Sequence, residues 1–264
     1  NLRGTDRMIR PEFKNSAIVS APEWLIMKNG ARTLRHLPVR YGVFEHPSAG
    51  KCLVDTGYSK RIMRGRRGFF LSLYASILKP KLTSDALQDA VPDVDTIIVT
   101  HLHADHISAL RDYPKARIML DGDALDHYLA AGWFQRIRHG FFKELLPDDF
   151  ADRLVHFQDC KTVEAPMGLG EAFDLFGDGR VLGIPLPGHM LGHTGILFTG
   201  DRPLLYAADS EWLWQAIDER RAPGFPATQI LEDKAAAEAT REKLRAFVAA
   251  GGELKLCHDP EGEG

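Results

Sequence analysis

The stretch THLHADH, from Thr100 to His106, holds three histidines and an aspartate within six positions. His101, His103 and Asp105, together with His106, offer the imidazole nitrogens and the carboxylate that bind zinc and, less selectively, iron, manganese or cobalt. No cysteine lies nearby, which argues against a structural zinc site built from thiolates. Chance would produce such a pattern in about one in a thousand chains of this length. The motif therefore indicates metal chemistry rather than a polar turn.

Four donors on so short a segment fit two metal ions better than one, because the side chains of neighbours such as Asp105 and His106 point in different directions. Each ion then needs further ligands from distant parts of the chain, which should also stand at the ends of strands. A carboxylate among them could bridge two cations through its two oxygens. Three residues follow a strand-like run in this way: His189, Asp209 and His258. His193 is a weaker candidate, for a supporting or turn position.

The elements that must position these donors are short apolar runs, each closed by a turn or a polar residue. They cover residues 51–57, 95–101, 116–121, 180–189, 194–201, 203–209 and 253–259. Helical patterns lie between several of them, most clearly at 232–252, where Leu244 and Phe247 share an apolar stripe and Gly251 offers a C-terminal stop. This alternation predicts a layered α/β fold with a mixed sheet. No repeat or linker divides the chain, which favours a single domain over residues 1–264.

Two aromatic-rich segments interrupt this alternation, 58–82 and 128–146, and we expect them to be lid-like insertions over one end of the sheet. The first also carries five basic residues between Lys60 and Arg67. Two interpretations are open: surface helices whose charges are solvated, or an apolar mouth for a substrate. On the second interpretation the residues that contact the substrate include Phe69, Phe70, Trp133 and Phe134.

The composition is that of an ordinary soluble globular protein, with 264 residues, 44% hydrophobic and 26% charged. A net charge of −3 argues against a general nucleic-acid binder. No apolar run approaches the roughly 20 residues that cross a bilayer. The cysteines, Cys52, Cys160 and Cys257, are odd in number and far apart, so a reducing cytoplasm is the default expectation. The chain begins without Met, which leaves room for a leader already removed.

In their order and intervals, the seven donors resemble the ligand set of the metallo-β-lactamase superfamily of dinuclear metal hydrolases, and the resemblance runs from about Val39 to His258. It implies an αβ/βα four-layer sandwich with a metal site along one edge. It also implies that one zinc is held by His101, His103 and His189, that the other is held by Asp105, His106 and His258, and that Asp209 bridges them. In the LVDTG element, Asp55 would support a ligand histidine, although an aspartate that only closes a turn fits equally well.

Two such cations, roughly 3.5–4 Å apart, would hold a bridging water as hydroxide and polarise a carbonyl or phosphoryl oxygen. Hydrolysis is the expected reaction. Asp105 is the expected catalytic residue, as the proton carrier for the leaving group, and a role as orienting ligand alone would also explain it.

Within the superfamily, the length and ligand spacing are most similar to the N-acyl-homoserine lactonases, which open the lactone ring of bacterial quorum-sensing signals; the enzyme would then be a quorum-quenching lactonase. β-Lactamases usually place Cys or Ser where Asp209 stands. One departure is clear: many lactonases have Tyr three residues after the bridging aspartate, where this chain has Trp212. Either another donor, such as Tyr206, assists at the substrate carbonyl, or the substrate differs. The expected partner is a small-molecule acyl substrate.

Three alternatives stay open. An acyl thioesterase could use the Lys60 to Arg67 cluster to meet the phosphates of a CoA-like carrier. A phosphodiesterase of the same superfamily is the second. The third is a regulator that keeps the fold, binds an acyl ligand without turnover and uses segment 58–82 to contact a partner or a membrane surface. The sequence also leaves open whether the chain forms a homodimer.

Overall fold

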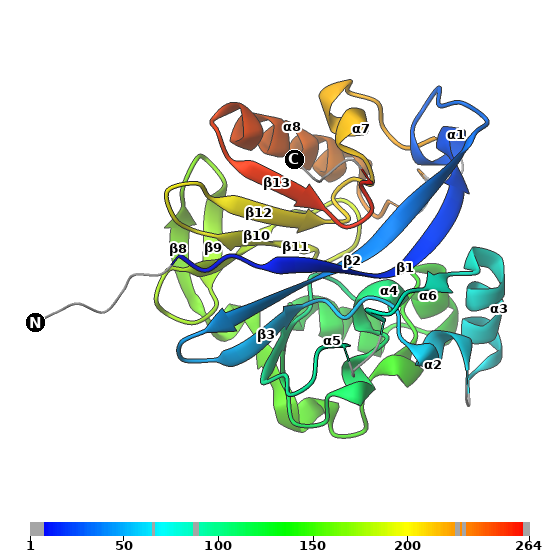
Figure 1. Ribbon diagram of the computed structural model, residues 1–264, viewed down its shortest axis with the longest axis horizontal. Helices are drawn as coiled ribbons and strands as arrows, with labels where there is room; N and C mark the ends of the chain where they lie inside the picture. The colour runs from blue at the N-terminus through cyan, green and yellow to red at the C-terminus, as the bar shows by residue number, and fades with distance from the viewer. Residues whose placement is uncertain (1–7, 65–66, 87–89, 225–227, 229–230, 261–264) are drawn as a thin grey trace, which may run out of the picture.

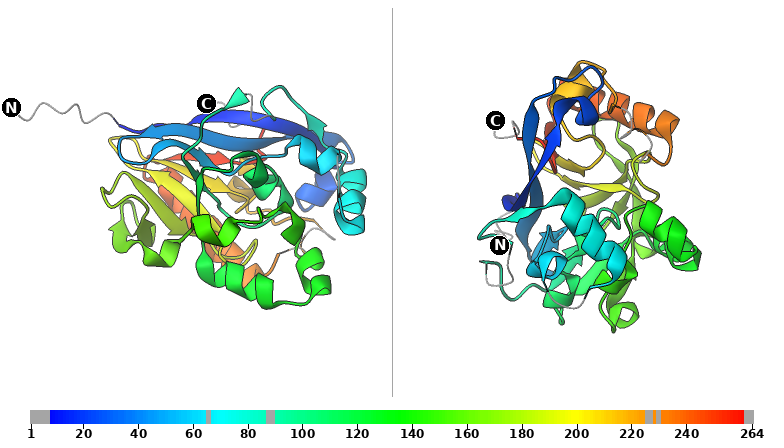
Figure 2. Two further views of the ribbon diagram at one scale, coloured as in Figure 1. Left: turned by 90° about the horizontal axis from the view of Figure 1, so that it is seen from below. Right: turned by 90° about the vertical axis from the view of Figure 1, so that its right-hand side faces the viewer.

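The computed structural model describes residues 8–64, 67–86, 90–224, 228 and 231–260. Gly65 and Arg66 of the basic cluster lie outside the described residues. Two sheets pack face to face, with helices on the outer sides (Figure 1). The expected four-layer αβ/βα sandwich is confirmed. In the left view of Figure 2, the long strands β1 and β2 (blue) lie above the strands of the second sheet (yellow to red).

The first sheet has the spatial order β4 (Lys81–Leu82), β1 (Glu12–Pro22), β2 (Leu34–His46), β3 (Gly50–Val54), β5 (Thr96–Ile98), β6 (Arg117–Leu120) and β7 (Leu154–His156). The second has the order β13 (Glu253–Leu256), β12 (Leu204–Ala208), β11 (Thr194–Phe198), β10 (Val181–Pro185), β9 (Gly170–Asp174) and β8 (Lys161–Ala165). The helices are α1 (Glu23–Ile26), α2 (Lys60–Met63), α3 (Phe69–Leu78), α4 (Ala104–Ile107), α5 (Gly122–Ala130), α6 (Trp133–Arg138), α7 (Trp214–Asp218) and α8 (Lys234–Ala249). Both sheets mix parallel and antiparallel pairs.

The main core lies between the two sheets. Phe44 of β2 packs edge-on against Phe198 of β11, with ring centroids 5.1 Å apart. Phe13 of β1 likewise contacts Tyr206 of β12, at 5.2 Å. Contacts of this kind bury aromatic area and hold the sheets at a fixed separation.

A second core joins α8 to the outer side of the second sheet. Leu244 and Phe247 are fully buried against this sheet, which confirms the predicted apolar stripe. The helix begins where the Asp233 carboxylate accepts hydrogen bonds from two backbone N–H groups, and it ends before Gly251, whose φ is +95°. In Figure 1, α8 lies across this sheet, while α2 to α6 lie on the other side of the molecule.

Every predicted strand run contains a strand, but the sequence patterns missed the long hairpin of β1 and β2. The reason is local. β1 has a register shift between Asn15 and Ala17, which breaks the alternation of apolar and polar residues that marks a half-buried strand. At the shift Ser16 is buried, and its hydroxyl donates to the carbonyl oxygen of Val39.

The two predicted insertions are built differently from each other. Segment 58–82 contains α2 and α3 and ends in β4, which pairs with β1 and so belongs to the first sheet. Segment 128–146 contains the end of α5, then α6 and a short 3-10 helix. The three cysteines are free. Among the described residues, no helix combines the length and the apolarity that a bilayer crossing requires.

Candidate metal centre

The predicted donors come together from loops that follow strands of both sheets. From the loop after β5 and from α4 come His101, His103, Asp105 and His106. From the second sheet come His189 in the β10–β11 loop, Asp209 after β12 and His258 after β13. β12 and β13 run parallel, so their carboxyl ends meet at the same edge. All of these side chains except His103 are almost completely buried.

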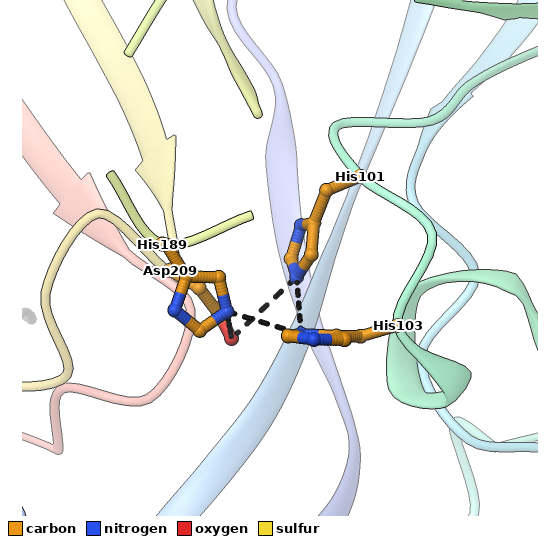
Figure 3. A group of neighbouring side chains, drawn as sticks. All are labelled: His101, His103, His189 and Asp209. Carbon is orange, nitrogen blue, oxygen red and sulfur yellow. Dashed lines mark hydrogen bonds and ion pairs between the residues drawn. The ribbon is translucent and has the colours of Figure 1, made fainter. Parts of the chain in front are cut away.

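Three imidazoles and one carboxylate form the first group (Figure 3). Nε2 of His101 and Nε2 of His189 each lie 3.0 Å from Nδ1 of His103. Oδ2 of Asp209 lies 3.6 Å from Nε2 of His189. Ligands of a tetrahedral zinc with bonds of 2.0–2.1 Å are about 3.3 Å apart. The spacing therefore fits one small divalent cation.

Asp209 also belongs to a second group, with His106, Cys257 and His258. Its Oδ1 lies 3.4 Å from Nε2 of His106, and its Oδ2 lies 3.3 Å from Nε2 of His258. Asp105 adds a carboxylate oxygen 3.4 Å from Nε2 of His258. Asp209 thus lies between the two groups, as a bridging carboxylate requires. Its Oδ2 faces His189 and His258, and its Oδ1 faces His106.

The second group leaves two buried polar atoms without a hydrogen-bond partner, Nε2 of His106 and Oδ1 of Asp209. Buried polar atoms are rarely left in this state, and each costs free energy when unpaired. His106 already donates from Nδ1 to the Asp55 carboxylate, at 2.7 Å. The nitrogen that faces Asp209 is therefore the unprotonated one in the neutral ring, as a metal ligand requires. A cation between the two atoms would satisfy both.

The electrostatics divide the histidines into two kinds. Burial lowers the pKa of His101 and of His189 well below the usual value, so both rings are neutral and available as ligands. Burial would also lower the pKa of His106 and His258, but neighbouring anionic groups raise both pKa values well above the usual one. Without a cation these two rings would hold a second proton, and a bound cation would take the place of that proton. Burial would raise the pKa of Asp209, yet the adjacent histidines hold it well below its usual range. The second group thus carries the excess of negative charge that a cation would balance.

Asp55 lies beside the donor groups, in the turn after β3. It is fully buried, with φ at +60°, and it accepts hydrogen bonds from the backbone N–H of Thr100 at 2.8 Å and from the hydroxyl of the same residue. With the bond from His106, the carboxylate fixes both the ring orientation and the start of the ligand loop. This geometry favours the supporting role over that of a mere turn residue.

Two further histidine contacts position ligands through the backbone. His193 donates from Nδ1 to the carbonyl of Leu186 at 3.1 Å, and its Nε2 accepts the backbone N–H of Asp209 at 3.2 Å. Burial lowers the pKa of His193 to about 4, so the ring stays neutral and can accept this bond. His258 donates from Nδ1 to the carbonyl of Pro38 at 2.8 Å, which directs its Nε2 to the centre.

The loop that carries His189 is held against α8 and α5. A Cβ on Gly188, whose φ is +130°, would lie 2.3 Å from Cα of Ala237, so only glycine permits this approach. On the other side, Oε2 of Glu232 accepts the backbone N–H of Leu191 at 2.7 Å and the hydroxyl of Tyr128 at 2.6 Å.

Replacing Glu232 by Ala is expected to lower the free energy of unfolding by about 1 kcal/mol, because two hydrogen bonds at a solvent-exposed carboxylate are lost. Glu232→Gln keeps an oxygen acceptor and serves as the matched control, with most of the stability retained. Urea unfolding of both variants provides the measurement. If the Ala variant unfolds at the same urea concentration as the unchanged protein, the two hydrogen bonds of Glu232 contribute nothing to stability.

The predicted substrate-contacting residues fall into three places. Tyr206 is buried in the core, and its hydroxyl donates to the carbonyl of Arg40 at 3.4 Å, so it does not present a phenol to a substrate in this structure. Trp212 is half-buried and packs against a small cluster that includes Ile26 and Leu37. Exposed at the surface lie Phe69, Phe70, Trp133 and Phe134. Contact with a substrate stays a prediction for the other five aromatic residues, Phe69, Phe70, Trp133, Phe134 and Trp212.

Sequence reasoning missed Cys257 and a phenol near the centre. Cys257 had a signal, since it stands directly before His258. Tyr74 of α3 had none, because its place depends on how α3 folds back; its hydroxyl lies 2.7 Å from that of Tyr58. Burial, and then the hydroxyl and carboxylate groups around it, raise the pKa of its partner Tyr58 well above the usual value. The phenol of Tyr58 therefore stays protonated.

Comparison with known proteins gives a family and a fold. The sequence model of the Metallo-beta-lactamase superfamily matches residues 36–250. Two curated relatives are named N-acyl homoserine lactonase AttM. The protein of Agrobacterium fabrum is 26% identical over 217 residues, covering 77% of this chain and 76% of its own length. The protein of Rhizobium johnstonii is 26% identical over 244 residues, covering 89% and 86%.

Solved structures share the fold at low sequence identity. A quorum-quenching N-acyl homoserine lactone hydrolase superimposes with a TM-score of 0.68 at 18% identity, over 98% of this chain and 96% of its own. The dizinc quorum-quenching lactonase AidC, solved with the product N-hexanoyl-L-homoserine, gives a TM-score of 0.66 at 17% identity, over 97% and 91%.

Proposed function

The chain belongs to the metallo-β-lactamase superfamily, and from this premise we propose that it is a dinuclear zinc-dependent hydrolase that opens the ring of an N-acyl-homoserine lactone. The observation that carries the proposal is the shared carboxylate of Asp209 between two clustered donor groups. The names of the AttM relatives support the lactone as substrate class.

One ion would be held by His101, His103 and His189, and the other by Asp105, His106 and His258, with Asp209 between them. Cys257 lies in the second group as a further donor. Imidazole and carboxylate ligands suit zinc, and they also accept iron, manganese or cobalt. Such a metal pair supplies Lewis acidity toward the substrate carbonyl and a nucleophile from water near neutral pH.

The protein side chains supply proton transfer and orientation. The pKa of Asp105 is lowered, because His106 and His258 outweigh the effect of burial, so its carboxylate is ionised and can accept a proton. It lies beside both histidines, 3.6 Å and 3.4 Å from their Nε2 atoms. We assign it the transfer of the proton from the attacking water to the alkoxide that leaves when the ring opens. Asp55 and His193 keep the ligands in place.

The acyl chain would run toward segments 58–82 and 128–146. The turn after α6 reaches the centre, since a Cβ on Gly140 would lie 3.0 Å from Cδ2 of His103. Two residues further along the chain, the buried ring of Phe142 lies 5.2 Å from that of Tyr74. We take these two rings as the start of an apolar lining for the acyl chain.

A side-by-side assay of the zinc-loaded enzyme tests the proposal. The substrates are short-chain and long-chain acyl-homoserine lactones, an acyl-CoA thioester and a phosphodiester, with His106→Ala as the inactive control. We expect the largest kcat/KM on a long-chain lactone and its loss in the variant. A preference for the thioester would move the assignment to the thioesterase alternative. Inactivity on all four substrates, in protein that holds two metal ions, would refute the proposed reaction.

A further inference from the structure

Exposed apolar side chains gather on one end of the molecule. Of the twelve large hydrophobic residues that are exposed among the described residues, eight belong to segments 58–82 and 128–146. We call them the α3/α6 face: Met63, Phe69, Phe70, Leu73, Ile77, Leu78, Trp133 and Phe134. Figure 1 shows α3 at the right-hand end of the molecule, with α6 beside it. The left view of Figure 2 shows α3 (cyan) at the same end.

The aromatic part of this face is continuous. The rings of Phe70 and Trp133 lie 5.4 Å apart and join the two helices. Phe69 extends the surface on one side and Phe134 on the other, with ring distances of 5.3 Å and 5.9 Å to their neighbours. Phe69 is 75% exposed and Phe134 is 66% exposed. A contiguous apolar surface of this kind marks an interaction site rather than the ordinary scatter of surface residues.

Folding alone does not explain the exposed side of α3. The helix already buries Leu71 and Ala75 against the core. Its opposite side carries Leu73 and Ile77, four residues apart and therefore neighbours on the helix surface, where a solvated helix would have polar residues. Ile77 is 70% exposed. The apolar outer side therefore needs a partner other than the protein's own core.

The charges around this face point to an anionic partner. The two segments hold ten of the chain's 33 Lys and Arg residues but only one of its 36 Asp and Glu residues. Lys60 and Lys79 are exposed at the two ends of the α2–α3 unit, and Arg64 is exposed between the two helices. The single acid, Glu144, accepts the backbone N–H of Gly68. An overall acidic chain thus concentrates its positive charge where its apolar surface is exposed.

A second copy of the chain does not fit these charges well. In a two-fold dimer built on this face, the same basic surface would lie against itself, and like charges would be brought together. An anionic bilayer matches both properties of the face. Aromatic and aliphatic side chains can enter the boundary between headgroups and acyl chains, while Lys and Arg remain among the phosphates.

We propose that the α3/α6 face docks the protein on an anionic phospholipid membrane. Phe69, Ile77 and Phe134 enter the headgroup boundary, and Lys60 and Lys79 lie against the lipid phosphates. Because the turn after α6 reaches the metal centre, docking would place the centre close to the lipid, from which an acylated substrate could be taken up. That last consequence rests on the proposed function, whereas docking does not.

Co-sedimentation with vesicles tests docking without any substrate. The full chain, loaded with zinc, is mixed with vesicles of phosphatidylcholine alone or with vesicles that also contain phosphatidylglycerol. We expect binding to the second kind, weakened at least about ten-fold when salt rises from about 0.05 to 0.5 M, because the headgroup attraction is screened. Absence of binding to the anionic vesicles at low salt would overturn the proposal.

Matched variants locate the binding surface. Leu73→Ser combined with Ile77→Ser is expected to weaken vesicle binding at least about ten-fold, because two exposed apolar groups no longer enter the lipid. Leu34→Ser, at a residue that is 61% exposed on β2, is the control and should bind as the unchanged protein does. Equal losses in both variants would overturn the assignment to this face. So would a dimer in solution that the double variant converts to monomers, since the face would then be a contact between copies.

Discussion

Replacing Asp209 by Asn is expected to reduce lactone kcat/KM by a factor on the order of 10³, comparable to the loss of a principal electrostatic stabiliser. Asp209 is the side chain common to both donor groups. An amide offers one oxygen acceptor instead of two and carries no negative charge, so it cannot neutralise two cations at once. We also expect the bound metal to fall below two ions per chain. Steady-state kinetics and elemental analysis of the purified variant measure the two effects.

The control for this substitution is Asp201→Asn, in the exposed turn between β11 and β12. It makes the same chemical change without touching either donor group, and it should keep both activity and metal content. The bridging role would be wrong if the Asp209 variant kept two ions per chain and activity within ten-fold of the unchanged protein.

Asp55→Asn is expected to weaken metal binding at the second group by about 10–100-fold, the usual cost of losing an outer partner of a ligand histidine. Asn tolerates the left-handed backbone at this position, so the variant changes the carboxylate and little else. Three donors converge on that carboxylate, from His106 and from the backbone and hydroxyl of Thr100. An amide NH₂ turned toward His106 favours the other tautomer, with the proton on the nitrogen that should bind metal.

Competition with a chromogenic chelator measures the change in metal affinity. The control is Asp174→Asn, because Asp174 is also a buried aspartate whose carboxylate accepts backbone N–H groups, those of Gly177 and Gly179. We expect its metal affinity to be unchanged. If both variants lost metal equally, the effect of Asp55 would be one of general stability rather than of ligand orientation.

The sequence predicted His189, Asp209 and His258 as candidate donors because each follows a strand-like run, and their binding of a metal stays a prediction. His101, Asp209 and His258 all follow apolar runs that are strands in the structure, and parallel strands bring such ends together. Counting the donors predicted two ions that could share a carboxylate, whereas the choice of Asp209 as the bridge came from the resemblance to the superfamily. The positions of the candidate donors depend only on residue types and on short-range patterns.

Other features depend on tertiary packing and left no local signal. Tyr206 stands in a strand like the others, but its side chain points into the core between the sheets, where it meets Phe13. Tyr74 lies close enough to Asp105 and His258 for their charges to act on it only because α3 folds back toward them. Glu232 reaches Tyr128 across more than a hundred residues of chain. Such contacts are set by the assembled fold rather than by spacing.

Each donor group draws on both sheets: His101 and His106 come from the first sheet, while His189, Asp209 and His258 come from the second. Neither half of the chain can therefore assemble a complete group before the sheets have docked. A metal that binds only the assembled set of donors adds its binding free energy to folding. It would therefore stabilise the packing of the two sheets against each other. Nascent chains would reach full resistance to proteolysis only after they acquire metal.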